Sequence, residues 1–271
     1  MNFKLKAAIQ WCISWLPHST RINRLMQLHV TKSLPISDSE LNARVEIVNR
    51  HLKSYFDLNC VLPEKVLDIG SGSDLSLPLL MIKQANVVIA CDINRLANNY
   101  LINNIVNRIG LPSFAESGLE YVVYEPPIMP FADESFDLIT STSVLEHVPK
   151  FQVPVLAKEI YRMLKKDGVS SHHIAHKDHW SDSDKKIPPM NYLRYGEKAW
   201  KKYNPPLLHQ NRLLSSDFTS IFHGVGFHVR KILTKVAPPD FEISENFKNY
   251  GLEDLSTTHT WLILTKEGGN D

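Results

Sequence analysis

VLDIGSGSD, residues 66–74, is the stretch that decides the fold of this 271-residue chain. Its first half is an apolar run of strand length that contains one acid, Asp68, and its second half is a turn with two glycines, Gly70 and Gly72. In open α/β sheets, ligands bind outside the carboxyl ends of the strands. Glycines in such a turn accept a positive φ and let the backbone approach a ligand closely. The stretch therefore predicts the first strand of an α/β sheet with a ligand site at its end.

The rest of the chain alternates between apolar runs of strand length and helix-like segments. Strand–helix alternation of this kind predicts a mostly parallel sheet with helices on both faces. After the strand at Lys65–Ile69, the expected strands are residues 87–91, 121–124, 136–140, 169–174, 226–235 and 258–265. The expected helices are residues 41–56, 96–109, 155–164 and 216–222, the first preceded by a capping box of Ser37 and Glu40.

The charge of the expected ligand follows from the same turn. A dinucleotide fingerprint reads GxGxxG, but Leu75 stands at the third glycine position, and the carboxylate of Asp68 would repel a pyrophosphate. S-adenosylmethionine (SAM) has no phosphate and carries an ammonium and a sulfonium, so a carboxylate favours it. The turn therefore predicts SAM as cofactor and leaves a nicotinamide-dependent oxidoreductase as the alternative.

Two motifs resemble those of class I SAM-dependent methyltransferases. VLDIGSGS is similar to the family's acidic-x-Gly-x-Gly-x-Gly motif, with Asp74 in place of the third glycine. EPPIMPFADESFDLI, residues 125–139, resembles the acidic-x-x-x-Leu-Pro-Phe-x-Asp-x-x-Phe-Asp stretch of the type 11, ubiquinone-biosynthesis-like branch. The resemblance covers residues 65–177 clearly and 226–266 loosely. It implies a Rossmann-like α/β fold with a seven-stranded sheet in the order 3-2-1-4-5-7-6, in which strand 7 is antiparallel.

The resemblance also implies which residues hold the cofactor. Asp92 ends the second strand and would accept hydrogen bonds from the ribose hydroxyls, while Glu125 would receive the adenine amino group. Pro126 stands where a backbone N–H would reach the adenine ring, and proline has none. The full set of cofactor residues that the resemblance implies is Asp68, Gly70, Ser71, Gly72, Asp92, Ile93, Glu125, Ser141 and Thr142.

The acceptor site is expected after the fifth strand, where residues 172–180 read HHIAHKDHW. A histidine near neutral pKa suits removal of a proton from a hydroxyl acceptor. We predict His176 or His179 as general base and Asp178 as the carboxylate that orients an imidazole. His147, in the Leu-Glu-His-Val segment, would contact the acceptor or act as base. A metal site is the alternative, with His173, His176, Asp178 and His179 as its ligands. Strand alternation places neighbouring residues on opposite faces, so we predict no metal.

A polar and aromatic insert at residues 175–212 predicts the acceptor class. Its mixture of rings and amides suits a sugar, so O-methylation of a sugar, glycan or other small polar acceptor is the leading prediction. A quinone-like metabolite and a non-catalytic SAM-fold binding protein are the alternatives. Asn204-Pro205-Pro206-Leu207 resembles a nucleobase-methylation motif, but it follows the fifth strand instead of the fourth. That position and the net charge of +1 argue against nucleic acid as partner.

The N-terminus reads as a helical extension, residues 1–60, before a methyltransferase domain at residues 61–271. Leu5, Ile9, Cys12 and Leu16 fall on one helical face, which predicts a helix packed on the domain. Weak contact with a membrane surface through Trp11 and Trp15 is the alternative. The three cysteines, at positions 12, 60 and 91, are too few and too far apart for a disulfide framework, and we predict a cytoplasmic protein.

Overall fold

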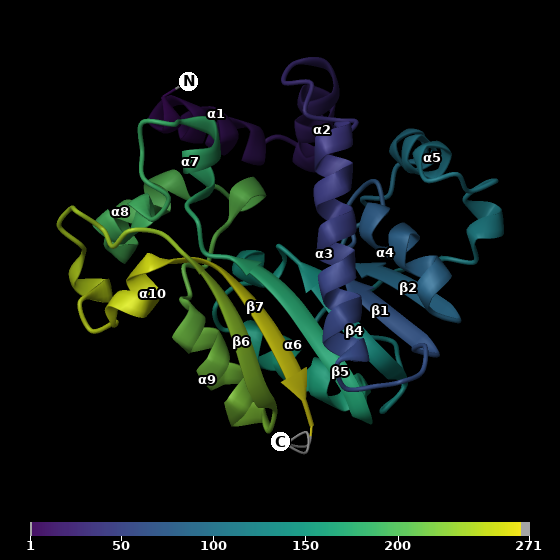
Figure 1. Ribbon diagram of the computed structural model, residues 1–271. Helices are drawn as coiled ribbons and strands as arrows, with labels where there is room; N and C mark the ends of the chain where they lie inside the picture. The colour runs from purple at the N-terminus through teal and green to yellow at the C-terminus, as the bar shows by residue number, and fades with distance from the viewer. Residues whose placement is uncertain (1, 267–271) are drawn as a thin grey trace.

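The computed structural model describes residues 2–266. Its centre is a seven-stranded sheet in the order β3-β2-β1-β4-β5-β7-β6, as the resemblance implies (Figure 1). The strands are β1 (Lys65–Ile69), β2 (Val87–Asp92), β3 (Glu120–Val123), β4 (Phe136–Thr142), β5 (Leu164–Ala175), β6 (His228–Lys235) and β7 (Thr257–Thr265). All neighbouring pairs are parallel except those of β7, which runs antiparallel to β5 and β6. The predicted fold class is confirmed.

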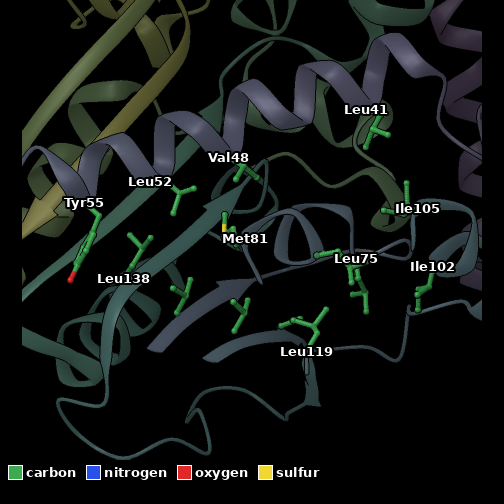
Figure 2. Packing of buried hydrophobic residues seen from close by; sticks show 14 of the residues in the cluster. Leu41, Val48, Leu52, Tyr55, Leu75, Met81, Ile102, Ile105, Leu119 and Leu138 are labelled. Carbon is green, nitrogen blue, oxygen red and sulfur yellow. The ribbon is translucent and has the colours of Figure 1, made fainter. Parts of the chain in front are cut away.

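Helices cover both faces of this sheet. The longer helices are α3 (Asp38–Phe56), α5 (Asn99–Arg108), α6 (Val153–Met163) and α9 (Ser215–Val225), and the short α4 (Ser76–Met81) follows the glycine turn. One core packs α3, α4 and α5 against one face of the sheet (Figure 2). A second core packs α6 and α9 against the other face. Apolar side chains of β1 and β4 enter both cores, as expected for central strands that are buried on both faces.

The start of α3 follows the predicted capping box. The Ser37 hydroxyl accepts a hydrogen bond from the backbone N–H of Glu40, and the Glu40 carboxylate accepts one from the backbone N–H of Ser37. These two bonds satisfy donors that a helix start leaves without partners. From there α3 crosses the sheet and buries Val48, Leu52 and Tyr55 beneath it (Figure 2).

The insert at residues 175–212 forms a layer of short helices with a core of its own. Its elements are α7 (His179–Ser183), α8 (Glu197–Trp200) and three 3₁₀ turns at Asn191–Arg194, Lys201–Tyr203 and Pro206–Leu208. The N-terminal helix α1 (Phe3–Ser14) packs on this layer, where the Trp11 indole N–H donates to the carbonyl of Lys202. The helix α2 (Ser19–His29) then leads to α3, and α10 (Leu252–Ser256) precedes β7 (Figure 1). The predicted packing of the first helix on the domain is therefore observed.

The face of α1 that packs against the insert is not the face that the sequence predicts. Phe3, Ala7, Gln10 and Ile13 are buried, whereas Leu5, Ile9, Cys12 and Leu16 are exposed. Phe3 decides the rotation, because its ring packs against that of Tyr203 in the insert core. The contact with a membrane surface stays a prediction, and the exposed stripe would make it together with Trp15. Among the described residues, no helix is long and apolar enough to cross a bilayer.

Candidate functional site

A cavity of 690 Å³ opens at the carboxyl ends of β1, β2 and β4. One half of its wall comes from these strand ends and from the loop after β3. The other half comes from residues 143–156 and from the 206–209 segment of the insert. The cavity therefore extends from the predicted cofactor turn to the acceptor side of the sheet.

The glycine turn follows β1 with the predicted backbone geometry. Gly70 has φ +72° and Gly72 has φ +73°, a region that residues with a Cβ rarely adopt. The Gly70 N–H donates to the carbonyl of Cys91 on β2, and the Ser71 hydroxyl donates to the carbonyl of Asp68. These bonds hold the turn across the ends of two strands, and Gly70 lines the cavity.

Asp68 lies buried beneath the turn with half of its carboxylate unpartnered. One oxygen accepts a hydrogen bond of 2.9 Å from the Thr140 hydroxyl, and the other has no partner within the described part of the chain. Burial raises the pKa of Asp68 to about 6, because a low-dielectric site disfavours the charged form. A cation placed nearby would offset that penalty and favour the ionised carboxylate.

Asp74, which replaces the third glycine of the motif, is tied to α3. Both of its carboxylate oxygens accept from the Arg44 guanidinium at 2.7 Å, and one also accepts from the backbone N–H of Ser76. The ion pair is largely buried, and the N–H bond lies at the start of α4. The replacement therefore links the turn to the helix that covers the sheet.

Asp92 and Ile93 form the next part of the cavity wall. Asp92 is 7 % exposed, accepts a bond of 3.1 Å from the backbone N–H of Asn94 and has its pKa raised by burial. Tyr124, Pro126 and Pro127 continue the wall after β3. Glu125 is exposed and does not belong to the lining, so its predicted adenine contact has no counterpart in the cavity wall.

Comparison with known proteins agrees with this geometry. Residues 67–171 match the family described as a methyltransferase domain. PH0226 from Pyrococcus horikoshii OT3 superposes with a TM-score of 0.55 at 16 % identity, covering 89 % of this chain and 98 % of that one. YcgJ from Bacillus subtilis superposes with a TM-score of 0.50 at 18 % identity, covering 81 % of this chain and 100 % of that one. The CurJ carbon methyltransferase superposes with a TM-score of 0.51 at 14 % identity, covering 91 % of this chain and 58 % of that one. No curated protein matches the sequence.

The chain contains a class I SAM-dependent methyltransferase domain. The identities to the solved structures are low, so those structures show the fold, and the matched domain shows the activity. SAM is accordingly the methyl donor, and the alternative of a nicotinamide-dependent oxidoreductase is set aside. Membership of the ubiquinone-biosynthesis-like branch stays a prediction.

The cavity of the methyltransferase fits SAM. Beneath the turn, one buried carboxylate oxygen of Asp68 has no hydrogen-bond partner among the described residues, and Gly70 of the turn lines the cavity. A positively charged ligand in the cavity would favour the ionised form of this carboxylate. Gly72 has no atom within 4 Å of where its Cβ would stand, so the turn leaves open space on that side. Asp92 and Ile93 add a carboxylate and an apolar side chain to the cavity wall, where the resemblance places the nucleoside.

Two residues expected near the methionine part of SAM have other partners. The Ser141 hydroxyl is bonded to Nδ1 of His172 at 2.7 Å, and the Thr142 hydroxyl is bonded to Nε2 of His51 on α3 at 3.0 Å. Neither residue belongs to the cavity lining, whereas the next two, Ser143 and Val144, do. The chain after β4 therefore meets the cavity two residues later than the sequence predicts.

His176 and Asp178, two of the predicted catalytic residues, are fully engaged inside the protein. Both ring nitrogens of His176 are bonded, one to the carbonyl of Leu213 and one to the Thr260 hydroxyl, and burial lowers its pKa to about 4. Asp178 caps α7 through the backbone N–H of Trp180 and accepts a second bond from the Asn191 amide. Neither residue belongs to the cavity lining, so this geometry gives no support to the prediction of His176 as base and Asp178 as its orienting partner.

The other two predicted catalytic residues come together. The His147 and His179 rings lie 4.9 Å apart between centroids, and His147 lines the cavity. Its Nδ1 is 2.7 Å from the carbonyl of His209, which fixes the proton on that nitrogen and leaves Nε2 with a free lone pair. Burial lowers the pKa of His179 to about 4, so its imidazole is neutral near pH 7.

Sequence reasoning missed Glu146 and His209. Glu146 is 2 % exposed, and burial raises its pKa to about 8. His209 lines the cavity and belongs to the insert, directly after residues 205–208, Pro-Pro-Leu-Leu. The Leu-Glu-His-Val resemblance contained the signal for Glu146. No local pattern marks His209, because only the folded insert carries it to the cavity.

The aromatic and amide residues of the insert lie mostly in its core. Tyr192 and Trp200 are almost fully buried, and so are Asn211 and Arg212, whose polar groups bond to backbone carbonyls. The predicted sugar-stacking surface is therefore mostly absent from the cavity wall. The acceptor half of that wall is instead largely apolar, with Val148, Pro149, Phe151, Val155, Leu156, Pro206 and Leu207 beside His147, Gln152 and His209.

We expect the affinity for SAM to rise with pH through about 6, because cationic SAM favours ionised Asp68. If the bound pKa falls to its ordinary range, the dissociation constant at pH 5 should be about tenfold larger than at pH 7. The stability of the ligand-free protein should change in the opposite sense. A raised folded-state pKa stabilises the fold below the unfolded pKa, and this contribution is lost as pH rises through about 6. Calorimetric titration of SAM at several pH values measures the first effect.

Asp68→Asn is the control, because it keeps the Thr140 bond and removes the titrating group. Its pH dependence should be clearly flatter than that of the wild type. Equal slopes for the two proteins would show that another group, such as Asp92, governs the response.

Proposed function

We propose that this methyltransferase transfers the methyl group of SAM to a hydroxyl of a small acceptor with an apolar body, of the quinone-like class. The observation that supports the proposal is the single cavity that joins the glycine turn to an apolar acceptor half with histidines at its wall. Ligand pockets of this kind bind the body of a molecule through apolar contacts and orient it through a few polar groups.

Methyl transfer to a hydroxyl needs an acceptor oxygen close to the methyl group and a group that takes up its proton. SAM supplies an electrophilic methyl group on a sulfonium. His147 is the lining residue suited to the proton, because its Nδ1 bond to His209 leaves Nε2 as an acceptor. Phe151, Leu207 and their apolar neighbours would exclude water from the acceptor body and hold it against that histidine.

A sugar or glycan acceptor, the leading expectation from the sequence, has less support from the cavity. The prediction depended on rings and amides of the insert that could stack on a sugar and bond to its hydroxyls. Tyr192, Trp200 and Asn211 lie in the core and do not reach the cavity. An acceptor that exposes many hydroxyls would leave them against apolar walls, which costs free energy for every unpaired group.

The test is methyl transfer from labelled SAM to two acceptor panels, hydroxylated aromatics and quinols in one and sugars and glycans in the other. We expect turnover with the first panel, detected as a mass increase of one methyl group. Replacement of His147 by alanine should lower kcat by about 100-fold, the usual range for loss of a general base, with SAM affinity unchanged. His223→Ala, at an exposed histidine of α9, is the matched control. Turnover confined to the sugar panel would overturn the proposed acceptor class.

A further inference from the structure

His147, which lines the acceptor half of the cavity, forms with two neighbouring side chains a group that could hold one ion. Glu146, His147 and His179 each offer one ligand atom, and these atoms lie within 4.8 Å of one another. They come from the segment after β4 and from the start of α7, so the fold brings together residues that are far apart in the chain. We propose that this group binds a divalent transition-metal cation.

Glu146 provides the first independent support. One of its carboxylate oxygens accepts a bond of 3.3 Å from the backbone N–H of Ala175, which fixes the side chain. The other oxygen is buried and has no hydrogen-bond partner among the residues that the structure describes. A buried carboxylate oxygen without a partner is costly, and a cation is the ligand that would satisfy it.

The two histidines provide the second. Metal-binding histidines usually donate their other ring N–H to a carbonyl or carboxylate, which orients the ring. His147 has this arrangement, with Nδ1 bonded to the carbonyl of His209 and Nε2 left for a ligand. The ring of His179 packs against that of His147. Within the described residues no hydrogen bond engages either of its nitrogens, so both remain available.

The donor set indicates the kind of cation. Two imidazoles and one carboxylate suit zinc, manganese, iron, cobalt or nickel, whereas magnesium and calcium prefer sites built of oxygen. Three protein ligands leave coordination positions open, as in catalytic metal sites. His147 lines the acceptor half of the cavity, so a cation bound to it would lie next to the proposed acceptor.

Binding of a cation here does not depend on the proposed function. Its role in catalysis does rest on that function, because the cation would act on the proposed acceptor hydroxyl. A hydroxyl that binds a divalent cation has a lowered pKa and loses its proton more easily. With Nε2 of His147 bound to the cation, the cation would take over from the free imidazole the activation of the acceptor hydroxyl. The same group would also fix the position of the acceptor oxygen in the cavity.

The experiment uses the full chain, stripped with a chelator and without SAM or acceptor. Cobalt(II) is titrated in and followed by its visible absorption, and zinc(II) is titrated by calorimetry. We expect one cation per chain. Glu146→Gln, His147→Ala and His179→Ala should each lower the affinity by at least about 100-fold, because loss of an outer-shell partner alone lowers it by about 10–100-fold. His223→Ala, at an exposed position of α9, should bind as the wild type does.

The Glu146→Gln variant keeps an acceptor for the Ala175 N–H and replaces the buried acid with an amide of nearly the same shape, so without metal it should fold about as well as the wild type. A cation should raise the Tm of the wild type and leave that of this variant unchanged. Absence of cation binding to the wild type would overturn the site. So would binding by all three variants with the affinity of the wild type. Because no donor or acceptor is present, that result would leave the proposed function standing. Stoichiometric binding without methyl transfer to either acceptor panel would instead support the site and count against the function.

Discussion

Gly70→Ala is expected to destabilise the protein by about 2–5 kcal/mol and to abolish SAM binding. A left-handed backbone costs a residue with a Cβ about 1–2 kcal/mol, and Gly70 has φ +72°. The added Cβ would also stand 2.4 Å from Cγ2 and 3.1 Å from Cγ1 of Val144, well inside van der Waals contact. Overpacking of this kind adds typically about 1–3 kcal/mol. Urea unfolding measures the change in stability, and calorimetry measures the loss of SAM affinity.

Gly72→Ala separates the two causes. Gly72 has nearly the same φ, +73°, but nothing lies within 4 Å of where its Cβ would stand. We expect this variant to lose only about 1–2 kcal/mol. The double variant Gly70→Ala/Val144→Ala should recover part of the deficit of Gly70→Ala, because the colliding methyl groups are gone. Equal losses in the two single variants, with no recovery in the double variant, would show that backbone strain alone decides.

The cofactor half of the site could be predicted because its signals are local. Asp68, Gly70 and Gly72 lie within five consecutive residues, and their roles follow from a strand end and a turn. The position of Asp92 follows from parallel pairing. Ile69 of β1 lies opposite Cys91 of β2, and Asp92 directly follows Cys91. The order of the strands in the sheet could be predicted only from the family resemblance. The alternation of strands and helices predicts which segments are strands but not which strands are neighbours. Ser141 and Thr142 could not be placed, because their partners come from β5 and α3.

The acceptor half depends on contacts between distant segments, which a linear pattern does not contain. His176 and His179 are three residues apart, yet one lies against Thr260 in the core and the other against His147. β5 ends at Ala175, before both histidines, and α7 begins at His179, so strand alternation does not relate their directions. The first helix shows the same limit. Two apolar faces were available in its sequence, and the ring of Tyr203 selected the one with Phe3.

Asp92→Ala is expected to weaken SAM binding by at least about 100-fold and methyl transfer with it. Asp92 lines the cavity at the end of β2, and the family resemblance assigns it to the ribose hydroxyls. Hydrogen bonds to a charged acceptor contribute about 1.5–3 kcal/mol each, so loss of two accounts for that factor or more. Asp92→Asn should lie between, because the amide keeps one acceptor oxygen and loses the charge. Calorimetry at pH 7.5 gives the affinities of all three proteins.

Glu125→Gln is the comparison that makes this result informative. Both carboxylates were expected to hold the nucleoside, but Glu125 is exposed and outside the cavity lining. Its substitution should change SAM affinity by less than about threefold, a difference under 1 kcal/mol. A large loss at Glu125 with little change at Asp92 would mean that the cofactor binds with its nucleoside shifted toward the loop after β3. The apolar wall of Ile93, Tyr124 and Pro126 would then need another ligand, so the pair of variants tests the orientation of SAM as well as its affinity.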